Sequence, residues 1–115
     1  MFKKVFISLV LIVGSLNAQS KFKANIGCKI GTHERTWVAC IKSIKLNGRL
    51  KNNYELQQEY GFSPTSLTIN LPEHFDLTVL PDGNTKYFVQ ILTNKGKEVF
   101  YDEKANKYSG IRVGN

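Results

Sequence analysis

The residues best suited to chemistry in this chain are two cysteines, Cys28 and Cys40, and two histidines, His33 and His74. Neither histidine has metal-ligand spacing to the other. Because we expect both cysteines in a disulfide, no zinc ligand set can be assembled, and we predict no metal site. Both histidines are expected to be solvated loop residues.

Motifs for enzymatic catalysis are missing from the sequence. It has no nucleophile elbow, no phosphate-binding glycine loop and no carboxylate pair placed for glycoside hydrolysis. The run Asp82-Gly83-Asn84 resembles the start of a calcium loop, but the later oxygen ligands are absent, so we interpret it as a β-turn. We therefore predict neither an enzyme nor a cofactor.

The stretch Ile26–Leu46 contains both cysteines and the single tryptophan, Trp37. Apolar and polar residues alternate on both sides of a polar run, which predicts two strands joined by a turn. If Cys28 lies directly opposite Cys40, the loop spans residues 32–36 and Trp37 points away from the sulfur atoms. By the chain-entropy estimate such a disulfide contributes about 3 kcal/mol to stability.

Residues 1–18 have the three-part layout of a secretory signal peptide. Two lysines precede an apolar run, Val5–Val13, and the segment ends in Ala18. The run is about half of the ~20 residues that a membrane-spanning helix needs, so we expect cleavage after Ala18, with Ser20 as a second choice, and no transmembrane segment afterwards. An oxidising compartment also favours the disulfide. We predict a secreted or periplasmic protein.

Residues 19–115 are enough for one domain with one hydrophobic core. Turn signals recur roughly every 8 to 13 residues, which is typical of an antiparallel sandwich or small barrel. Because the cysteines are close in sequence, we expect them to join neighbouring strands, so the likeness to immunoglobulin domains is one of architecture. We predict an all-β fold: an immunoglobulin-like β-sandwich, or a small barrel, of about eight short strands.

A register conflict arises at the predicted turn Asn47-Gly48, the commonest two-residue hairpin turn. The alternation from Tyr54 to Phe62 predicts a strand after it, but a strict two-residue turn would place core positions opposite polar ones. A β-bulge near Lys42 or a three-residue loop removes the conflict, and we favour the bulge. The strand around residues 87–92 has apolar residues on both faces and should lie inside a sheet.

The formal charge of +7 is concentrated in the first third of the chain, where Glu34 is the single acid between residues 21 and 51. In the predicted hairpin most of the basic residues share the outward face with the tryptophan. A cationic face around an exposed aromatic ring suits an acidic protein, an anionic glycan or a lipid headgroup. The same lysines could instead keep the sheet soluble, and the tryptophan could face a second layer. The expected partner-binding residues are Trp37, Lys29, Arg35, Lys45, Arg49 and Lys51.

We therefore predict an exported, monomeric, non-enzymatic binding module that docks a protein or polysaccharide through this basic face. An alternative is an inhibitor or immunity protein of an extracellular hydrolase, of lysozyme or protease type, acting through the braced loop at residues 32–36. A second alternative is a carrier of a hydrophobic ligand between the sheets. Export and the lack of a binding motif argue against nucleic acid. Aromatic residues available to such a carrier are Tyr54, Tyr60, Phe62, Tyr87 and Phe88.

Overall fold

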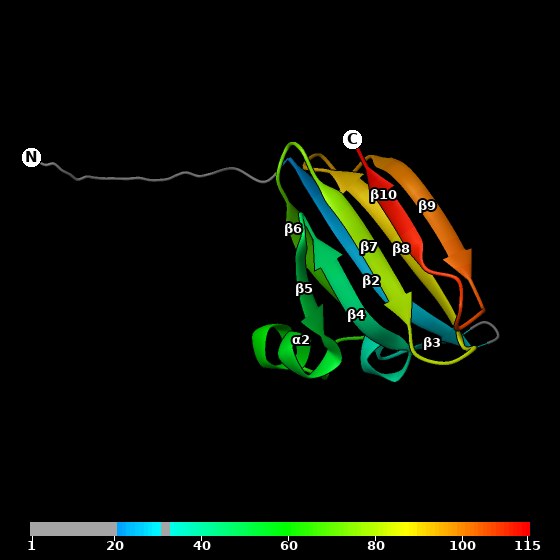
Figure 1. Cartoon of the computed structure of the whole chain (residues 1–115). Coiled ribbons are helices and arrows are strands. Elements are labelled where there is room, and N and C mark those ends of the chain that lie inside the picture. Colours follow the sequence, from blue (N-terminus) through cyan, green and yellow to red (C-terminus); the bar gives the residue numbers. More distant parts are fainter. Residues whose placement is uncertain (1–20, 31–32) are drawn as a thin grey trace, which may run out of the picture.

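The computed structural model describes residues 21–30 and 33–115, which form two antiparallel β-sheets packed face to face (Figure 1). The predicted all-β sandwich is thereby confirmed. The predicted signal peptide, residues 1–18, lies outside the described residues, as do residues 31–32 and the side chains of residues 30 and 33–35.

One sheet has five strands, arranged around a long central strand. This strand, β2 (Phe22–Ile30), pairs on one side with β8 (Lys86–Thr93) along most of its length. On its other side it pairs with β6 (Ser66–Leu71) and β3 (His33–Arg35), which follow one another along the strand. The remaining strand, β9 (Glu98–Lys104), pairs with the far side of β8. The prediction that β8 lies inside a sheet is confirmed.

The other sheet has four strands in the order β10-β7-β4-β5. These are β10 (Ile111–Gly114), β7 (Asp76–Pro81), β4 (Ile41–Leu46) and β5 (Arg49–Asn52). Alternate residues of both sheets point inward, as the period of a β-strand requires. The buried core is built from these inward side chains, including Ala24, Ile26, Leu67, Ile69, Leu77, Val79, Tyr87, Val89 and Ile91.

The connection from β2 to β4 differs from the predicted hairpin. Cys28 lies opposite Arg35 of β3, not opposite Cys40. The chain then leaves the sheet through a 3-10 helix, η2 (Trp37–Ala39), and enters β4 in the other sheet. The Cys28–Cys40 disulfide is confirmed, with the Cα atoms 5.9 Å apart. It joins the two sheets instead of neighbouring strands, because alternation shows which residues face inward but not which sheet they belong to.

Trp37 is fully buried, so its predicted place on an exposed face is wrong. It lies in η2, where the chain crosses between the sheets, and its carbonyl oxygen is 3.6 Å from Sγ of Cys28. A buried tryptophan near a disulfide between sheets is also found in antibody domains. Here, however, the cysteines are only 12 positions apart in sequence.

Residues expected to form a strand are instead the helix α2 (Asn53–Tyr60). Asn52 Oδ1 accepts a hydrogen bond from the backbone N–H of Glu55 (2.9 Å), and Glu55 Oε1 accepts one from that of Asn52 (2.9 Å). This reciprocal cap is a strong helix start. Leu56 and Tyr60, four positions apart, pack against the core. A spacing of four fits alternation as well as a helix, so the apolar pattern alone did not distinguish them.

The predicted turn and bulge around β4 are confirmed. Asn47 and Gly48 form the two-residue turn between β4 and β5, with φ values of 50° and 84°. The register of β4 shifts between Ile41 and Ser43, which places the bulge at Lys42. The strand opposite the bulge is β7 and not β5, because the chain enters α2 where a longer β5 would have continued.

Replacement of both cysteines by alanine should lower the free energy of unfolding by about 3 kcal/mol, because the unfolded chain regains the entropy of the open loop. Urea denaturation followed by tryptophan fluorescence measures the loss, since buried Trp37 is the single tryptophan. Wild-type protein in reducing agent is the control and should lose the same amount. An unchanged unfolding midpoint in both samples would contradict a stabilising disulfide.

Tyr87 should make stability depend on alkaline pH. Its buried hydroxyl donates a hydrogen bond to the carbonyl oxygen of Ser109 (2.6 Å), and burial, together with the charge of Asp102, raises its pKa to about 12. Because the folded state favours the neutral phenol, this stabilisation is complete below the unfolded pKa of about 10 and is lost as the pH rises through about 12.

We expect this group to remove roughly 2–3 kcal/mol of unfolding free energy between about pH 10 and 12. Urea denaturation of the wild type and of Tyr87→Phe across that range provides the measurement. The two proteins differ only in the hydroxyl group of residue 87, so the difference between the two curves isolates Tyr87. Parallel curves would show that its pKa is not raised.

Candidate functional site

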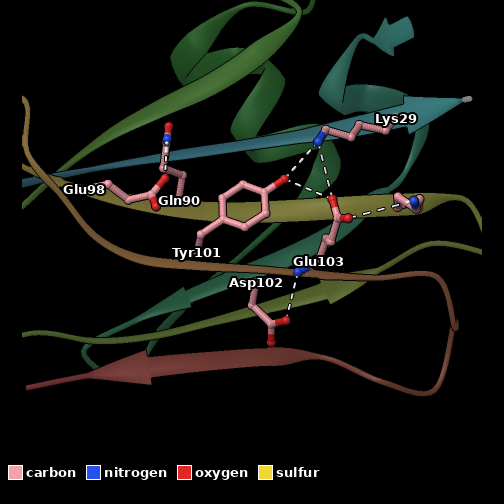
Figure 2. Close-up of polar contacts among 7 residues, drawn as sticks. Lys29, Gln90, Glu98, Tyr101, Asp102 and Glu103 are labelled. Atoms are coloured by element: carbon pink, nitrogen blue, oxygen red, sulfur yellow. Dashed lines mark hydrogen bonds and ion pairs between the residues drawn. The ribbon is translucent and has the colours of Figure 1, made fainter. Parts of the chain in front are cut away.

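Outward-facing side chains of β2, β8 and β9 meet in a polar cluster on the five-stranded sheet (Figure 2). Lys29 of β2 lies opposite Lys86 of β8, and Phe88 of β8 lies opposite Glu103 of β9. Tyr101 is two positions before Glu103 and therefore points to the same face. We call Lys29, Lys86, Tyr101 and Glu103 the Lys29 cluster.

A single carboxylate organises the polar contacts of the Lys29 cluster. The ammonium group of Lys29 donates hydrogen bonds to the hydroxyl oxygen of Tyr101 (2.9 Å) and to Oε2 of Glu103 (3.3 Å). The Tyr101 hydroxyl donates to the same Oε2 (2.9 Å), and Nζ of Lys86 lies 3.8 Å from Oε1. Figure 2 shows Lys29 reaching from β2 toward Tyr101 and Glu103. The cluster is thus cross-linked over three strands.

The ammonium group of Lys29 also contacts two aromatic rings, those of Phe88 and Tyr101. The rings of Phe88 and Tyr101 are stacked, with centroids 6.0 Å apart, and Nζ of Lys29 lies 5.4 Å and 5.5 Å from their respective centroids. Both distances suit a cation–π contact. Gly27 makes room for this arrangement, since a Cβ atom there would come within 2.9 Å of the Phe88 ring.

The contacts within the cluster stabilise the ionised forms of Lys29 and Glu103. The pKa of Lys29 is raised by its hydrogen bond to Tyr101 and by Glu103. The pKa of Glu103 is lowered by the hydrogen bond from Tyr101 and by Lys29. Both pKa values move away from neutrality, whereas proton transfer at neutral pH needs a group that titrates nearby. The cluster is therefore better suited to recognition by fixed charge than to acid–base catalysis.

A row of amide side chains continues the polar surface beside the cluster. Asn25 Nδ2 donates to Oε1 of Gln90 (3.1 Å), and Nε2 of Gln90 donates to Oε1 of Glu98 (2.9 Å). The hydroxyl of Thr68 donates to Oδ1 of Asn25 (2.9 Å). Between the row and the cluster lies a hollow of about 290 Å³, which we call the outer hollow. Its lining residues are Asn25, Lys29, Ser66, Phe88, Gln90 and Tyr101.

The predicted basic face does not form one surface, because β2 and β4 belong to different sheets. Lys29 lies on the outer face of the five-stranded sheet, whereas Lys45 lies on the outer face of the four-stranded sheet, opposite Thr78. Arg49 and Lys51 line a small hollow beside α2.

The remaining two predicted binding residues are Trp37 and Arg35. Trp37 is in the core. Arg35 belongs to β3, but its side chain is outside the described residues. Of the six predicted residues, only Lys29 therefore contributes to the outer hollow.

Part of the predicted inhibitory loop, residues 32–36, can be placed. Thr32 lies outside the described residues, and the side chains of residues 33–35 are not described. The hydroxyl of Thr36 lies within hydrogen-bond distance of the carbonyl oxygens of Phe62 (2.9 Å) and Pro64 (3.1 Å). Residues 33–35 form the strand β3, so the predictions of a loop over residues 32–36 and of His33 as a loop residue are wrong. The chain just after β3 is tied at Thr36 to the segment after α2.

His74 is exposed, as predicted. Within residues 21–30 and 33–115, histidine, cysteine and carboxylate side chains form no cluster of three or more that could hold a metal ion. In the same part of the chain, no helix has the length and apolar character needed to cross a membrane.

A second candidate site lies between β9 and β10, the edge strands on one side of the sandwich. Here an apolar groove of about 410 Å³ opens between the sheets, and we call it the edge groove. None of the aromatic residues predicted for a hydrophobic ligand lines it. Those that do line it are Phe22, Phe75, Ile91, Val99, Phe100, Val113, Gly114 and Asn115.

The predicted ligand-binding aromatic residues are scattered over the fold. Tyr87 lies in the core, and Phe88 lies on the outer face under Lys29. Tyr54 and Phe62 are exposed, within and just after α2. Tyr60 lines the small hollow beside α2. The strand predicted from Tyr54 to Phe62 would have placed Tyr54, Tyr60 and Phe62 on one face, which the helix α2 does not do.

Comparisons with family models, with curated proteins and with solved structures gave no match to this chain. We therefore infer function from its own side chains. Sequence reasoning missed Asn25, Gln90 and Tyr101, although each is a polar or amphipathic residue at an outward position of a strand. They become neighbours only through the strand order β2-β8-β9.

Proposed function

We propose that this protein is a small exported, non-enzymatic binding module that docks a polysaccharide or protein partner on the outer face of its five-stranded sheet. The observation that supports this most is the outer hollow, whose side chains are already held by hydrogen bonds to one another. Groups ordered before binding lose little conformational entropy when the partner docks. The proposal keeps Lys29 from the predicted face and replaces the other five residues.

The chemistry of the hollow favours a hydroxyl-rich or acidic partner. The amides of Asn25 and Gln90 offer donors and acceptors together, which suits a ligand with many hydroxyl groups. The ring of Tyr101 adds a flat, partly exposed apolar surface. Two lysines against one glutamate leave the Lys29 cluster with a net positive charge, which attracts an anionic partner.

Export is the second part of the proposal. It is supported by the signal-peptide layout of residues 1–18 and by the disulfide, because disulfides persist in oxidising compartments. A periplasmic or secreted location would bring the outer hollow into contact with envelope polysaccharides and exported proteins.

Binding should be tested with alginate, an anionic polysaccharide, and with polyglutamate, an acidic polypeptide, at low and high salt. We expect Lys29→Glu to weaken binding of the preferred probe by at least about tenfold at low salt, because it reverses the central charge of the hollow. The matched control is Lys45→Glu, which makes the same charge change on the other sheet and should retain wild-type affinity within about twofold.

Each outcome of this experiment is informative. Stronger binding of one probe identifies the class of partner. An equal loss of affinity in Lys29→Glu and Lys45→Glu would mean that the net charge of the protein, and not the outer hollow, controls binding. Failure of the wild type to bind either probe at low salt would reject an anionic partner at this face.

A carrier of a hydrophobic ligand is a second candidate function, and the edge groove favours it. The volume of about 410 Å³ falls in the range of small-molecule sites, and the lining is almost wholly apolar. Val99 lines the groove with 52 % of its surface exposed, although most of the other residues of β9 are charged. An apolar ligand would cover this exposed surface.

Native mass spectrometry of protein purified without detergent should then show bound lipid. In a titration with a fluorescent fatty acid, Val99→Glu should lose most of the binding, because a carboxylate would enter the apolar groove. Leu50→Glu is the control, since Leu50 is similarly exposed, at 58 %, but lies in β5, outside the groove. Equal binding by all three proteins would remove the edge groove as a ligand site.

A further inference from the structure

The edge strands of the two sheets differ in how well they are protected against pairing with another chain. Natural edge strands carry charges, bulges or proline, or are very short. The edge strand β9 has several charged residues and a register shift between Ile91 and Leu92 of its partner. The edge strand β10 has only four residues, including Arg112, and β5 carries Arg49 and Lys51 before it runs into α2.

The edge strand β6 lacks these protections. Its six residues, Ser66–Leu71, include no charge and no proline. All six pair with β2 in one uninterrupted register, so the strand contains no bulge. Among the described residues, β2 is its only strand partner. The backbone groups on its other side are therefore open to a further strand.

A small hollow adjoins the inner side of this edge. It has a volume of about 90 Å³ and is bounded by Ile69 of β6, by β4 and β5 of the other sheet and by α2. A strand that paired with β6 would place the side chain beside Ile69 on the same inward face. That side chain would point into the hollow, where Leu46 and Leu56 provide apolar contacts. The space suits one aliphatic side chain.

The rim of the hollow is cationic. Arg49 and Lys51 both line it, and the ammonium group of Lys51 is paired with the carboxylate of Glu59. Arg49 is exposed and takes part in no ion pair among the residues that the structure describes. The hydrogen bond from Lys51 and the charge of Arg49 both lower the pKa of Glu59, so Arg49, Lys51 and Glu59 together leave the rim with one net positive charge. An acidic side chain next to the aliphatic one would be attracted by that charge.

We propose that β6 is a β-augmentation site for an extended segment of a partner protein. The segment pairs with Ser66–Leu71, inserts an aliphatic side chain beside Ile69, and places an acidic side chain against Arg49. A second copy of this chain fits less well, because β6 contains no acidic residue and two paired copies would leave both Arg49 side chains without an anion. This site is separate from the outer hollow and does not depend on it.

The test uses the full disulfide-bonded mature chain and a synthetic blocked peptide, Thr-Val-Thr-Leu-Thr-Glu-Thr, in which Val, Leu and Glu share one face. Titration into isotope-labelled protein should shift the backbone amide NMR signals of Ser66–Leu71. It should also slow the hydrogen exchange of Thr68 and Asn70, whose N–H groups point away from β2. A control peptide with proline in place of the two Thr residues that flank the central Leu keeps the Leu side chain. It lacks the N–H groups that would donate to β6 in an antiparallel pair and should leave these signals unchanged.

A charge exchange tests the predicted orientation. Arg49→Glu should weaken binding of the Glu peptide by about tenfold, and a peptide with Lys in place of Glu should recover that loss with the same variant. Lys29→Glu should bind the peptide like the wild type, which separates this site from the outer hollow.

Several outcomes would overturn the proposal. The first is that no backbone amide signal shifts at millimolar peptide. The second is that the shifts are confined to β9 or the outer hollow. The third is that the Glu peptide and the Lys peptide bind Arg49→Glu with equal affinity. If the protein dimerised without peptide and the backbone amides of β6 exchanged slowly in that dimer, a second copy of the chain would occupy the edge instead.

Discussion

The crossing between the sheets is the constraint on which the arrangement of this protein depends. Between Ile30 and Ile41 the chain must leave the centre of one sheet and enter the other, and η2 makes that change of layer. The Cys28–Cys40 disulfide closes the same short segment covalently, with buried Trp37 between the two cysteines in sequence. Because this link ties the sheets to each other, residues close in sequence on its two sides point to opposite surfaces of the sandwich.

The separation of Lys29 from Lys45 follows from this crossing and leaves room for a different surface. The outer face of the five-stranded sheet combines residues from β2, β6, β8 and β9, which pair through long-range contacts. Gly27 lets the Phe88 ring lie close to β2, and this ring supports the ammonium group of Lys29. The polar surface therefore depends on the position of an aromatic side chain that is itself buried.

The sides of the sandwich are open because two separate sheets have edges that a closed barrel would not have. Between β9 and β10 the opening is wide and apolar. Between β5 and β6 it is narrow, partly covered by α2, and has a cationic rim. The two sides thus offer different chemistry, and we propose that one binds a hydrophobic molecule and the other a strand. Each is a consequence of which strands lie at the edges.

The sequence by itself determined the strand-rich fold, the disulfide, the Asn47-Gly48 turn, the bulge at Lys42 and the position of β8 inside a sheet. These features depend on local turn chemistry and on the inward or outward direction of alternate residues, both of which can be read from the sequence. Tertiary structure alone decided the sheet to which each strand belongs, and with it the inter-sheet disulfide and the burial of Trp37. The helix at residues 53–60 had a local signal in the cap pair Asn52 and Glu55, although the apolar positions Leu56 and Tyr60 satisfy either period. The outer hollow joins Asn25, Gln90 and Tyr101 across strands distant in sequence, because the order β2-β8-β9 depends on long-range pairing that local alternation does not reveal.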